Sequence, residues 1–359
     1  MSSLTEQARP PSPTMKAYLY AGPGALRVTT VPRPEVASGG AIMRVSVSSI
    51  CGTDIRTHRF GNSRLRPPRV IGHEACGVLA EVGPRVKGFH EGDRVFVVPA
   101  IGCGVCPSCR RGHTNMCSDL HTIGFEYDGT FASYLKIPES AFAMGNVVRL
   151  DSVVSDQEAT LTEPVACCLN GQGFLGIEPQ DVVFIFGAGF IGCIHAELAL
   201  RSGAARVIVS DVSTRRLELV SKLLAGVELL DSLKTDVADF VRRTTAGFGA
   251  DVIITACAVG VTHAAAMEIS ARRARISLFG GLPGKVDGFL DSNAIHYKEL
   301  SVYGSHASTV AENRRVLDMV AAREIDIAKY ASRTYPLERI DDAFEDLKGE
   351  HVLKVLVVP

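Results

Sequence analysis

The chain has 359 residues, more than one hydrophobic core usually holds, so about two domains are expected. Its 38 Lys and Arg residues nearly balance its 39 Asp and Glu residues, and the formal net charge of −1 provides no long-range field for polyanions. We therefore expect neither nucleic acid nor a membrane as a partner. Hydrophobic residues make up 46% and charged residues 21% of the chain, a globular composition that excludes global disorder.

The first 14 residues are polar and rich in proline, which predicts a flexible tail and a fold that starts near Met15. They contain no apolar stretch of the kind that a secretory signal needs, so we expect a cytoplasmic protein. No apolar run elsewhere approaches the roughly 20 residues of a membrane helix.

Short β-rich runs separated by Gly and Pro occupy residues 16–150, namely 41–49, 77–83, 93–99 and 131–138. Runs of this kind predict a partly open β-barrel or a mixed α+β domain.

From about residue 165, buried-strand runs alternate with amphipathic helical stretches; the runs are 181–186, 206–211, 227–231, 251–256 and 275–281. This alternation predicts a doubly wound parallel sheet, the Rossmann fold, over residues 166–304. The helices and the final strand of residues 305–359 lie outside this rhythm, so we assign them to the first domain with residues 15–165. The fold class is therefore α/β, and the cleft between the domains is where we expect ligands.

Four cysteines lie close together on a loop rich in Gly, with the spacing C-x2-C-x2-C-x7-C: Cys103, Cys106, Cys109 and Cys117. Four thiolates can hold one zinc ion tetrahedrally and leave no position open for substrate, so the pattern predicts a structural zinc site. Buried free thiols and an iron–sulfur cluster are the alternatives, and the absence of any further cysteine pattern favours zinc over the cluster. The remaining cysteines outside the predicted metal sites are interpreted as buried thiols: Cys76, Cys167, Cys168, Cys193 and Cys257.

A dinucleotide-binding pattern, G-x-G-x-x-G, directly follows the strand run 181–186 and precedes a helical stretch. In this pattern Gly187 permits the tight turn, Gly189 the close approach of a pyrophosphate, and Gly192 the packing of helix on sheet. Phe190 and Ile191 complete the loop.

Asp211 ends the second strand of the predicted sheet, where a carboxylate would bond the adenosine ribose hydroxyls and favour NAD. Arg215 and Arg216 follow, and they could flank the adenine or form a solvated helix face.

Further metal-binding residue types occur at Cys51, in the pair His73-Glu74, and at Glu163. Each alone is weak evidence. However, the pattern GHE-x2-G-x5-G-x2-V over residues 72–86, followed by GD-x-V over residues 92–95, closely resembles the zinc signature of medium-chain alcohol and polyol dehydrogenases. The four-cysteine loop resembles theirs too, and the likeness extends from about Met15 to Pro359. It is similar to the versions in sorbitol and threonine dehydrogenases.

This resemblance implies a second, catalytic zinc held by Cys51 and His73, with Glu74 or Glu163 as a carboxylate ligand and an open position for the substrate oxygen. Thr53 stands where the family has the hydroxyl of its proton relay. Asp54 corresponds to the acid that orients the histidine ligand, with a helix N-cap as the alternative.

The chain departs from the family pattern at Arg56, where many relatives have the histidine that completes the relay. Arginine does not deprotonate, so His58 or a water route would have to substitute. Arginines crowd this stretch, at positions 56, 59, 64, 66 and 69, which fits either an anionic substrate or a solvated loop. By the same resemblance, Phe60 and His306 would line the pocket, and Lys354 would lie near the pyrophosphate or on the surface.

The sequence thus predicts a zinc-dependent oxidoreductase, with two Zn²⁺ per chain, that transfers hydride between NAD and a secondary alcohol or ketone. The expected substrate is a polyol, sugar alcohol or cyclitol. An amino-alcohol or threonine-type dehydrogenase is the alternative, and a non-catalytic dinucleotide-binding sensor is a third possibility. The family resemblance also implies a homodimer or homotetramer.

Overall fold

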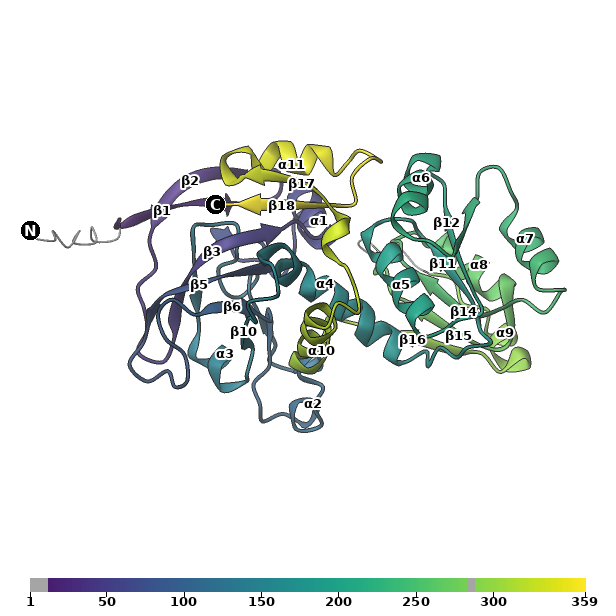
Figure 1. Cartoon of the computed structure of the whole chain (residues 1–359), viewed down its shortest axis with the longest axis horizontal. Helices are drawn as coiled ribbons and strands as arrows, with labels where there is room; N and C mark the ends of the chain where they lie inside the picture. The colour runs from purple at the N-terminus through teal and green to yellow at the C-terminus, as the bar shows by residue number, and fades with distance from the viewer. Residues whose placement is uncertain (1–11, 283–287) are drawn as a thin grey trace, which may run out of the picture.

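Two sheet systems lie on either side of one long helix, α4 (Asp156–Gly173), in the computed structural model, which describes residues 12–282 and 288–359 (Figure 1). Helix α4 begins with a capping box, in which the Ser155 and Glu158 side chains satisfy each other's backbone N–H groups. It contacts β3 and β5 of the first sheet and α5 of the second domain. One buried cluster of apolar side chains runs through both systems, so the two domains share core packing at this helix.

The first domain is built on a seven-stranded sheet in the order β10-β6-β5-β3-β18-β17, with β9 also paired to β3. Its strands are β3 (Ala41–Ser49), β5 (Glu74–Val82), β6 (Arg94–Val97), β9 (Tyr134–Ile137), β10 (Val147–Arg149), β17 (Ala331–Pro336) and β18 (Lys354–Val358). A three-stranded sheet in the order β2-β1-β4 adjoins it, made of β1 (Thr14–Tyr20), β2 (Leu26–Pro32) and β4 (Arg69–Val70), and β7 (Ala100–Ile101) pairs with β8 (His121–Thr122). Strands β17 and β18 bring the end of the chain back into this domain.

The second domain is a six-stranded parallel sheet in the order β13-β12-β11-β14-β15-β16. The strands are β11 (Val182–Phe186), β12 (Arg206–Asp211), β13 (Val227–Asp231), β14 (Ala250–Thr255), β15 (Ser270–Leu278) and β16 (Ser301–Gly304). Apolar strands buried on both faces favour parallel pairing, and the order reverses beside β11, where doubly wound sheets bind their ligands.

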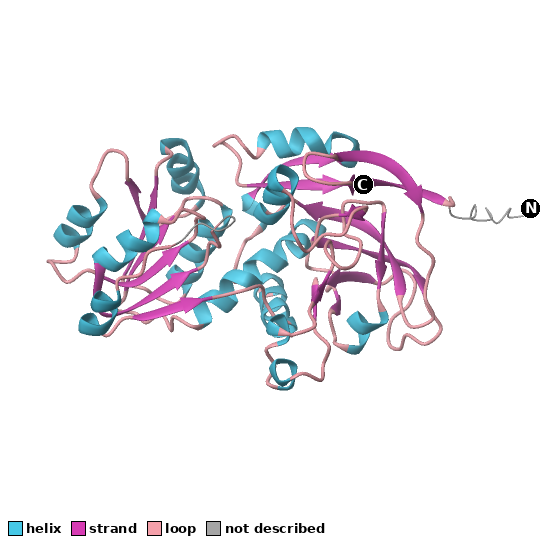
Figure 2. Cartoon of the chain, turned by 180° about the vertical axis from the view of Figure 1, so that it is seen from behind, coloured by secondary structure: helices cyan, strands magenta, loops and turns pink. Residues whose placement is uncertain are grey.

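The helices of the second domain flank this sheet (Figure 2). They are α5 (Phe190–Arg201), α6 (Thr214–Leu223), α7 (Val237–Thr244), α8 (Val261–Ile269) and α9 (Ser292–Lys298). The other helices are α1 (Gly52–Phe60), α2 (Pro107–Arg110), α3 (Glu139–Ala143), α10 (Val310–Ala321) and α11 (Ile340–Asp346), with short 3₁₀ turns at η1 (Thr114–Met116), η2 (Ala328–Tyr330) and η3 (Leu337–Arg339).

The predicted fold class is confirmed, and the strands at 41–49, 206–211 and 227–231 have the predicted bounds. The proposed domain boundary after residue 165 falls inside α4, which runs unbroken through it. Residues 1–11 of the predicted tail lie outside the described residues, and β1 begins at Thr14. None of the described helices combines the length and the apolar composition needed to cross a bilayer.

Candidate functional site

Three side chains with metal-binding atoms converge between α1 and the start of β5. Cys51 immediately precedes α1, and His73 and Glu74 follow a turn at Gly72, whose φ of +92° favours glycine. The sulfur of Cys51, a ring nitrogen of His73 and a carboxylate oxygen of Glu74 all lie within 4.8 Å of one another. The structure thus brings together three of the four predicted ligands of an open metal site.

Glu74 is fully buried, and its two carboxylate oxygens differ in their surroundings. Oε2 accepts a hydrogen bond from the Ser49 hydroxyl and lies 2.6 Å from the ammonium nitrogen of Lys354. Oε1 is buried without a hydrogen-bond partner among the described residues. A buried carboxylate oxygen that lacks a donor, beside a thiol and an imidazole, fits the donor set of a zinc ion.

Lys354 is buried, so of its two alternatives the surface lysine is wrong. Besides its ion pair with Glu74, its ammonium nitrogen lies 5.1 Å from the centre of the Phe190 ring, in the glycine-rich loop. Sequence reasoning missed this contact with Glu74 because the two residues lie at opposite ends of the chain and share no local motif.

Asp54 faces His73, with 3.5 Å between carboxylate Oδ1 and ring Nδ1. Its Oδ2 accepts a hydrogen bond of 3.0 Å from the backbone N–H of Cys51. The helix begins after Cys51, so the alternative of Asp54 as N-cap is wrong. Burial lowers the pKa of His73, but the negative charges of Asp54 and Cys51 outweigh it and raise that pKa well above its usual value.

Glu163, on α4, is buried near this group but is not part of the converging set. Its Oε1 lies 3.3 Å from the thiol of Cys167, one helical turn further on, and that thiol is 3.7 Å from the hydroxyl of Ser308. Burial raises the pKa of both Glu163 and Cys167, so the thiol is held in its neutral form. Cys167 therefore borders the metal-binding region. Cys76, Cys168 and Cys193 are buried as predicted, whereas Cys167 and Cys257 are only partly buried, which corrects the prediction for these two.

Helix α1 carries the residues of the predicted proton relay. Thr53 is partly exposed, and its hydroxyl has no hydrogen bond among the described residues. His58, the alternative relay group, stacks its ring on Phe344 with 4.6 Å between centroids. This contact holds His58 in the packing between α1 and α11.

Phe125 and Arg64 of the first domain lie close to the metal-binding group. The ring of Phe125 is 5.9 Å from that of His73, and the guanidinium of Arg64 lies 4.7 Å above Phe125. Arg64 also pairs with Glu126 at 2.8 Å. Burial and the charge of Arg64 lower the pKa of His306, which places this residue in the same region. Phe60 is largely exposed.

The four-cysteine loop folds around α2 and η1. The ligand atoms of Cys103, Cys106, Cys109 and Cys117 lie within 4.8 Å of one another. Backbone N–H groups point at several of the sulfurs. The N–H of Cys103 lies 3.2 Å from the sulfur of Cys117, and the N–H of Cys109 lies 3.5 Å from the sulfur of Cys106. Such donors stabilise thiolates, and donors from Cys109 and Ser118 lower the pKa of Cys106 to about 6. The cluster suggests a structural zinc site.

The glycine-rich loop joins β11 to α5. Gly187 has a φ of +108°, and a side chain at Gly192 would meet the Gly187 carbonyl oxygen at 1.8 Å, so helix and loop approach closely. A Cβ at Gly189 would meet nothing within 4 Å, and α5 has no side-chain cap. Open space before uncapped helix N–H groups fits the pyrophosphate of a dinucleotide.

Asp211 ends β12 beside this loop. Its Oδ2 accepts a hydrogen bond of 2.7 Å from the N–H of Ala188, and its Oδ1 one of 2.8 Å from Ser213. On α6, Arg215 is exposed, whereas Arg216 is partly buried with an Nε that has no acceptor among the described residues. The carboxylate predicted to select the cofactor is thus anchored directly to the loop.

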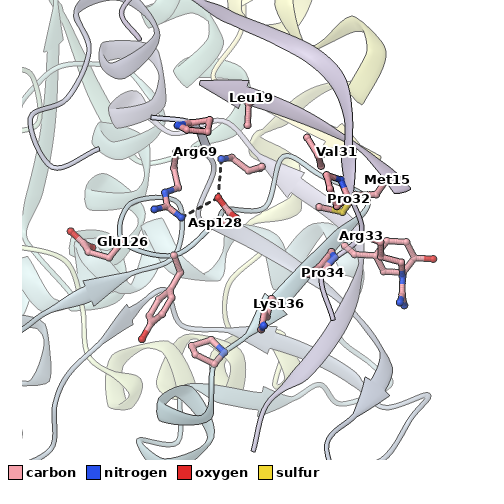
Figure 3. Close-up of a pocket in the computed structure, with 16 residues that line it drawn as sticks. Met15, Leu19, Val31, Pro32, Arg33, Pro34, Arg69, Glu126, Asp128 and Lys136 are labelled. Atoms are coloured by element: carbon pink, nitrogen blue, oxygen red, sulfur yellow. Dashed lines mark hydrogen bonds and ion pairs between the residues drawn. The ribbon is translucent and has the colours of Figure 1, made fainter. Parts of the chain in front are cut away.

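A cavity of about 470 Å³ lies elsewhere in the first domain, between β1, β2, β4 and β9 (Figure 3). Apolar side chains such as Met15, Leu19 and Val31 line it, and Asp128 joins Arg69 at its rim. None of the predicted site residues lines this cavity. It is therefore separate from the metal-binding and dinucleotide sites.

Comparisons with known proteins agree with this arrangement. The family described as "Alcohol dehydrogenase GroES-like domain" matches residues 37–147, and the one described as "Zinc-binding dehydrogenase" matches residues 191–322. The L-threonine 3-dehydrogenase of Pyrococcus abyssi is 32% identical, over 91% of this chain and 92% of its own. The sorbitol dehydrogenase of Halalkalibacterium halodurans is 29% identical, and the match covers 94% of this chain and 97% of that protein.

A zinc-binding dehydrogenase from Sinorhizobium meliloti 1021, solved with NADP, superposes with a TM-score of 0.88. It is 30% identical, and the match covers 96% of this chain and 99% of that one. The matched regions extend across both domains, and residues 37–147 include both groups of metal-binding side chains. The chain therefore belongs to the zinc-type alcohol dehydrogenases of the medium-chain dehydrogenase family.

Proposed function

We propose that this protein is an NAD-dependent, zinc-containing dehydrogenase that oxidises a secondary hydroxyl of a polyol, sugar alcohol or cyclitol. The observation that carries the proposal is the convergence of Cys51, His73 and Glu74, a group that Lys354 connects to Phe190 of the glycine-rich loop. An open site with sulfur, nitrogen and oxygen donors is typical of catalytic rather than structural zinc.

In this proposal Cys51, His73 and the free Oε1 of Glu74 would hold the catalytic zinc, and Glu163 is proposed as a further carboxylate ligand. Zinc, when bound, supplies a Lewis acid that lowers the pKa of the substrate hydroxyl. Asp54 holds the His73 ring so that Nε2 remains the metal-binding nitrogen. Lys354 and Ser49 fix Glu74 through its other oxygen.

Thr53 is assigned to the proton path. A hydroxyl can accept the proton of the substrate while it donates its own, and Thr53 is free to do so because no described residue engages its side chain. Arg56 follows Thr53 by three residues on α1, but arginine does not deprotonate and cannot pass the proton on. In this proposal the proton therefore leaves to water.

Cofactor binding is assigned to Gly187, Gly189, Phe190, Ile191, Gly192, Asp211 and Arg216. NAD supplies the hydride acceptor when it is bound. The Asp211 carboxylate would bond the adenosine ribose and repel the additional phosphate of NADP, which supports NAD for this chain although one structural neighbour was solved with NADP.

A threonine-type activity is the second candidate, because the relative from P. abyssi carries that name. A panel of polyols, inositols, L-threonine and sugar phosphates, each with NAD and with NADP, separates the possibilities by the absorbance of the reduced cofactor. We expect the highest kcat/KM with a polyol or cyclitol and NAD. A preference for L-threonine would establish the second candidate. NADH binding without turnover on any substrate would indicate a sensor.

A further inference from the structure

The side chain of Arg56, in the first domain, contacts the second domain. It lies on α1, three residues after Thr53 and therefore on the same face of the helix, and it is exposed. Its Nη1 lies 3.5 Å from the backbone oxygen of Gly281, the only acceptor it has in residues 12–282 and 288–359. No described carboxylate is within ion-pair distance, so among these residues its charge is uncompensated.

Gly281 lies at the edge of the parallel sheet where the dinucleotide loop is found. The preceding N–H, of Gly280, donates to Thr255 at the end of β14, and a Cβ on Gly280 would meet the Cys257 oxygen at 2.3 Å. The glycine-rich loop also approaches residues 256–257, because a Cβ on Gly187 would lie 3.2 Å from the Ala256 oxygen. Thus Gly281, residues 256–257 and the glycine-rich loop are adjacent at one carboxyl edge.

Arg56 thus belongs to the helix that begins at the metal-binding residue Cys51, and its guanidinium lies against the edge of the sheet that also holds the glycine-rich loop. A dinucleotide that extends from this loop to the metal has to pass it. The pyrophosphate carries the only negative charges of NAD, and a guanidinium without a carboxylate partner is the side chain best suited to them.

We propose that Arg56 binds the pyrophosphate of the dinucleotide from the side of the first domain, opposite the N-terminus of α5. This inference rests on the proposed function, because it needs a dinucleotide in the cleft. Arg56 would thus contact the cofactor from the first domain while it also contacts Gly281 of the second, and the proton leaves Thr53 by water.

The test is a titration of the zinc-loaded protein with NADH, followed by its fluorescence, and with ADP-ribose and AMP, followed by calorimetry. The variant Arg56→Gln should raise the Kd of NADH about 10-fold or more, the loss expected for one charged hydrogen bond. The Kd of ADP-ribose, which keeps the pyrophosphate but lacks nicotinamide, should rise by the same factor. AMP, which lacks the pyrophosphate, should bind nearly as before, and Arg56→Lys should recover part of the affinity.

Arg59→Gln is the matched control, because Arg59 is an exposed arginine on the same helix and its guanidinium lies over Phe60. It should leave all three Kd values close to those of the wild type. Wild-type affinity for NADH and ADP-ribose in Arg56→Gln, or an effect equal to that of Arg59→Gln, would overturn the inference and leave the proposed function standing. A wild-type protein that binds neither NADH nor ADP-ribose would overturn both.

Discussion

The hydroxyl of Thr53 gives the most direct residue-level test of the proton path. Thr53→Ala should lower the rate of hydride transfer about 10²–10⁴-fold, the usual contribution of a positioned proton-transfer group. Thr53→Ser keeps the hydroxyl and should retain most of the activity. Stopped-flow measurement of NADH formation gives the rate, and NADH titration should show an unchanged Kd in both variants. Equal rates for the Ala and Ser variants would remove Thr53 from the path.

Asp211 tests the choice of cofactor. Asp211→Ser should lower kcat/KM with NAD and raise it with NADP, because the carboxylate that would bond the ribose and repel the phosphate is removed. Each tenfold change in the preference corresponds to about 1.4 kcal/mol.

The same carboxylate also accepts the N–H of Ala188, so Asp211→Asn is the matched variant that loses the charge and keeps an acceptor. Steady-state kinetics with both cofactors decides the question. A wild-type preference for NADP, or an unaltered preference in both variants, would show that Asp211 does not select the cofactor.

At the residue scale, the sequence predicted the side chains that stand in short motifs. Cys51, His73 and Glu74 could be found because they stand in or near a short sequence pattern that resembles the zinc signature of a known family. Ser49, Lys354 and Cys167 could not, since their contacts with Glu74 and Glu163 arise only when β3, β18 and α4 pack together. The choice between Glu74 and Glu163 as the carboxylate ligand likewise depends on side-chain positions that spacing does not specify.

Helix α5 contains a buried histidine that should make stability depend on pH. Burial lowers the pKa of His195 to about 3, and its Nε2 has no partner among the described residues. The unfolded chain takes up this proton near pH 6.5 and the folded chain does not, so the stability falls as the pH drops below 6.5. At pH 5 the expected loss is about 2 kcal/mol relative to neutral pH.

His195→Gln should therefore show a smaller loss of unfolding free energy between pH 7 and pH 5, measured by urea denaturation. The exposed His90 is the control, and His90→Gln should keep the wild-type slope. If His195→Gln and the wild type lose equal amounts over this range, the histidine is not held neutral in the fold.

The four-cysteine loop should act through stability and not through the chemical step. Cys103→Ser should lower the zinc content by one ion per chain and Tm by about 5 °C or more, because a closed zinc site contributes folding free energy. The folded fraction should keep its kcat. Cys257→Ser, which changes a thiol outside both metal-binding groups, should keep the full zinc content. Loss of kcat without loss of Tm would contradict a structural role.

At the element scale, a strand was predictable where it formed a short apolar run between helical stretches. The strands at 206–211 and 227–231 were predicted with their observed bounds because parallel strands form continuous apolar runs. Strands β1, β2 and β17 were not, since β2 and β17 contain no buried residue and the first half of β1 is partly or fully exposed. Strand β17 also lies at the edge of its sheet.

For the whole molecule, the two-part organisation followed from the change in strand pattern near residue 165, but the junction itself did not. Helix α4 extends across it and packs on both domains, so its length is set by contacts that the local sequence does not contain. Because α4 also carries Glu163, the same helix links the domain junction to the metal-binding group.

The central claim is that Cys51, His73 and Glu74 hold a catalytic zinc distinct from the zinc of the cysteine loop. The measurement is the zinc content per chain, by elemental mass spectrometry, together with the rate of NAD reduction for wild type and Cys51→Ser. The account predicts two zinc ions in the wild type, and one ion, an unchanged Tm within a few degrees and almost no NAD reduction in Cys51→Ser. Two zinc ions and normal turnover in Cys51→Ser would contradict it.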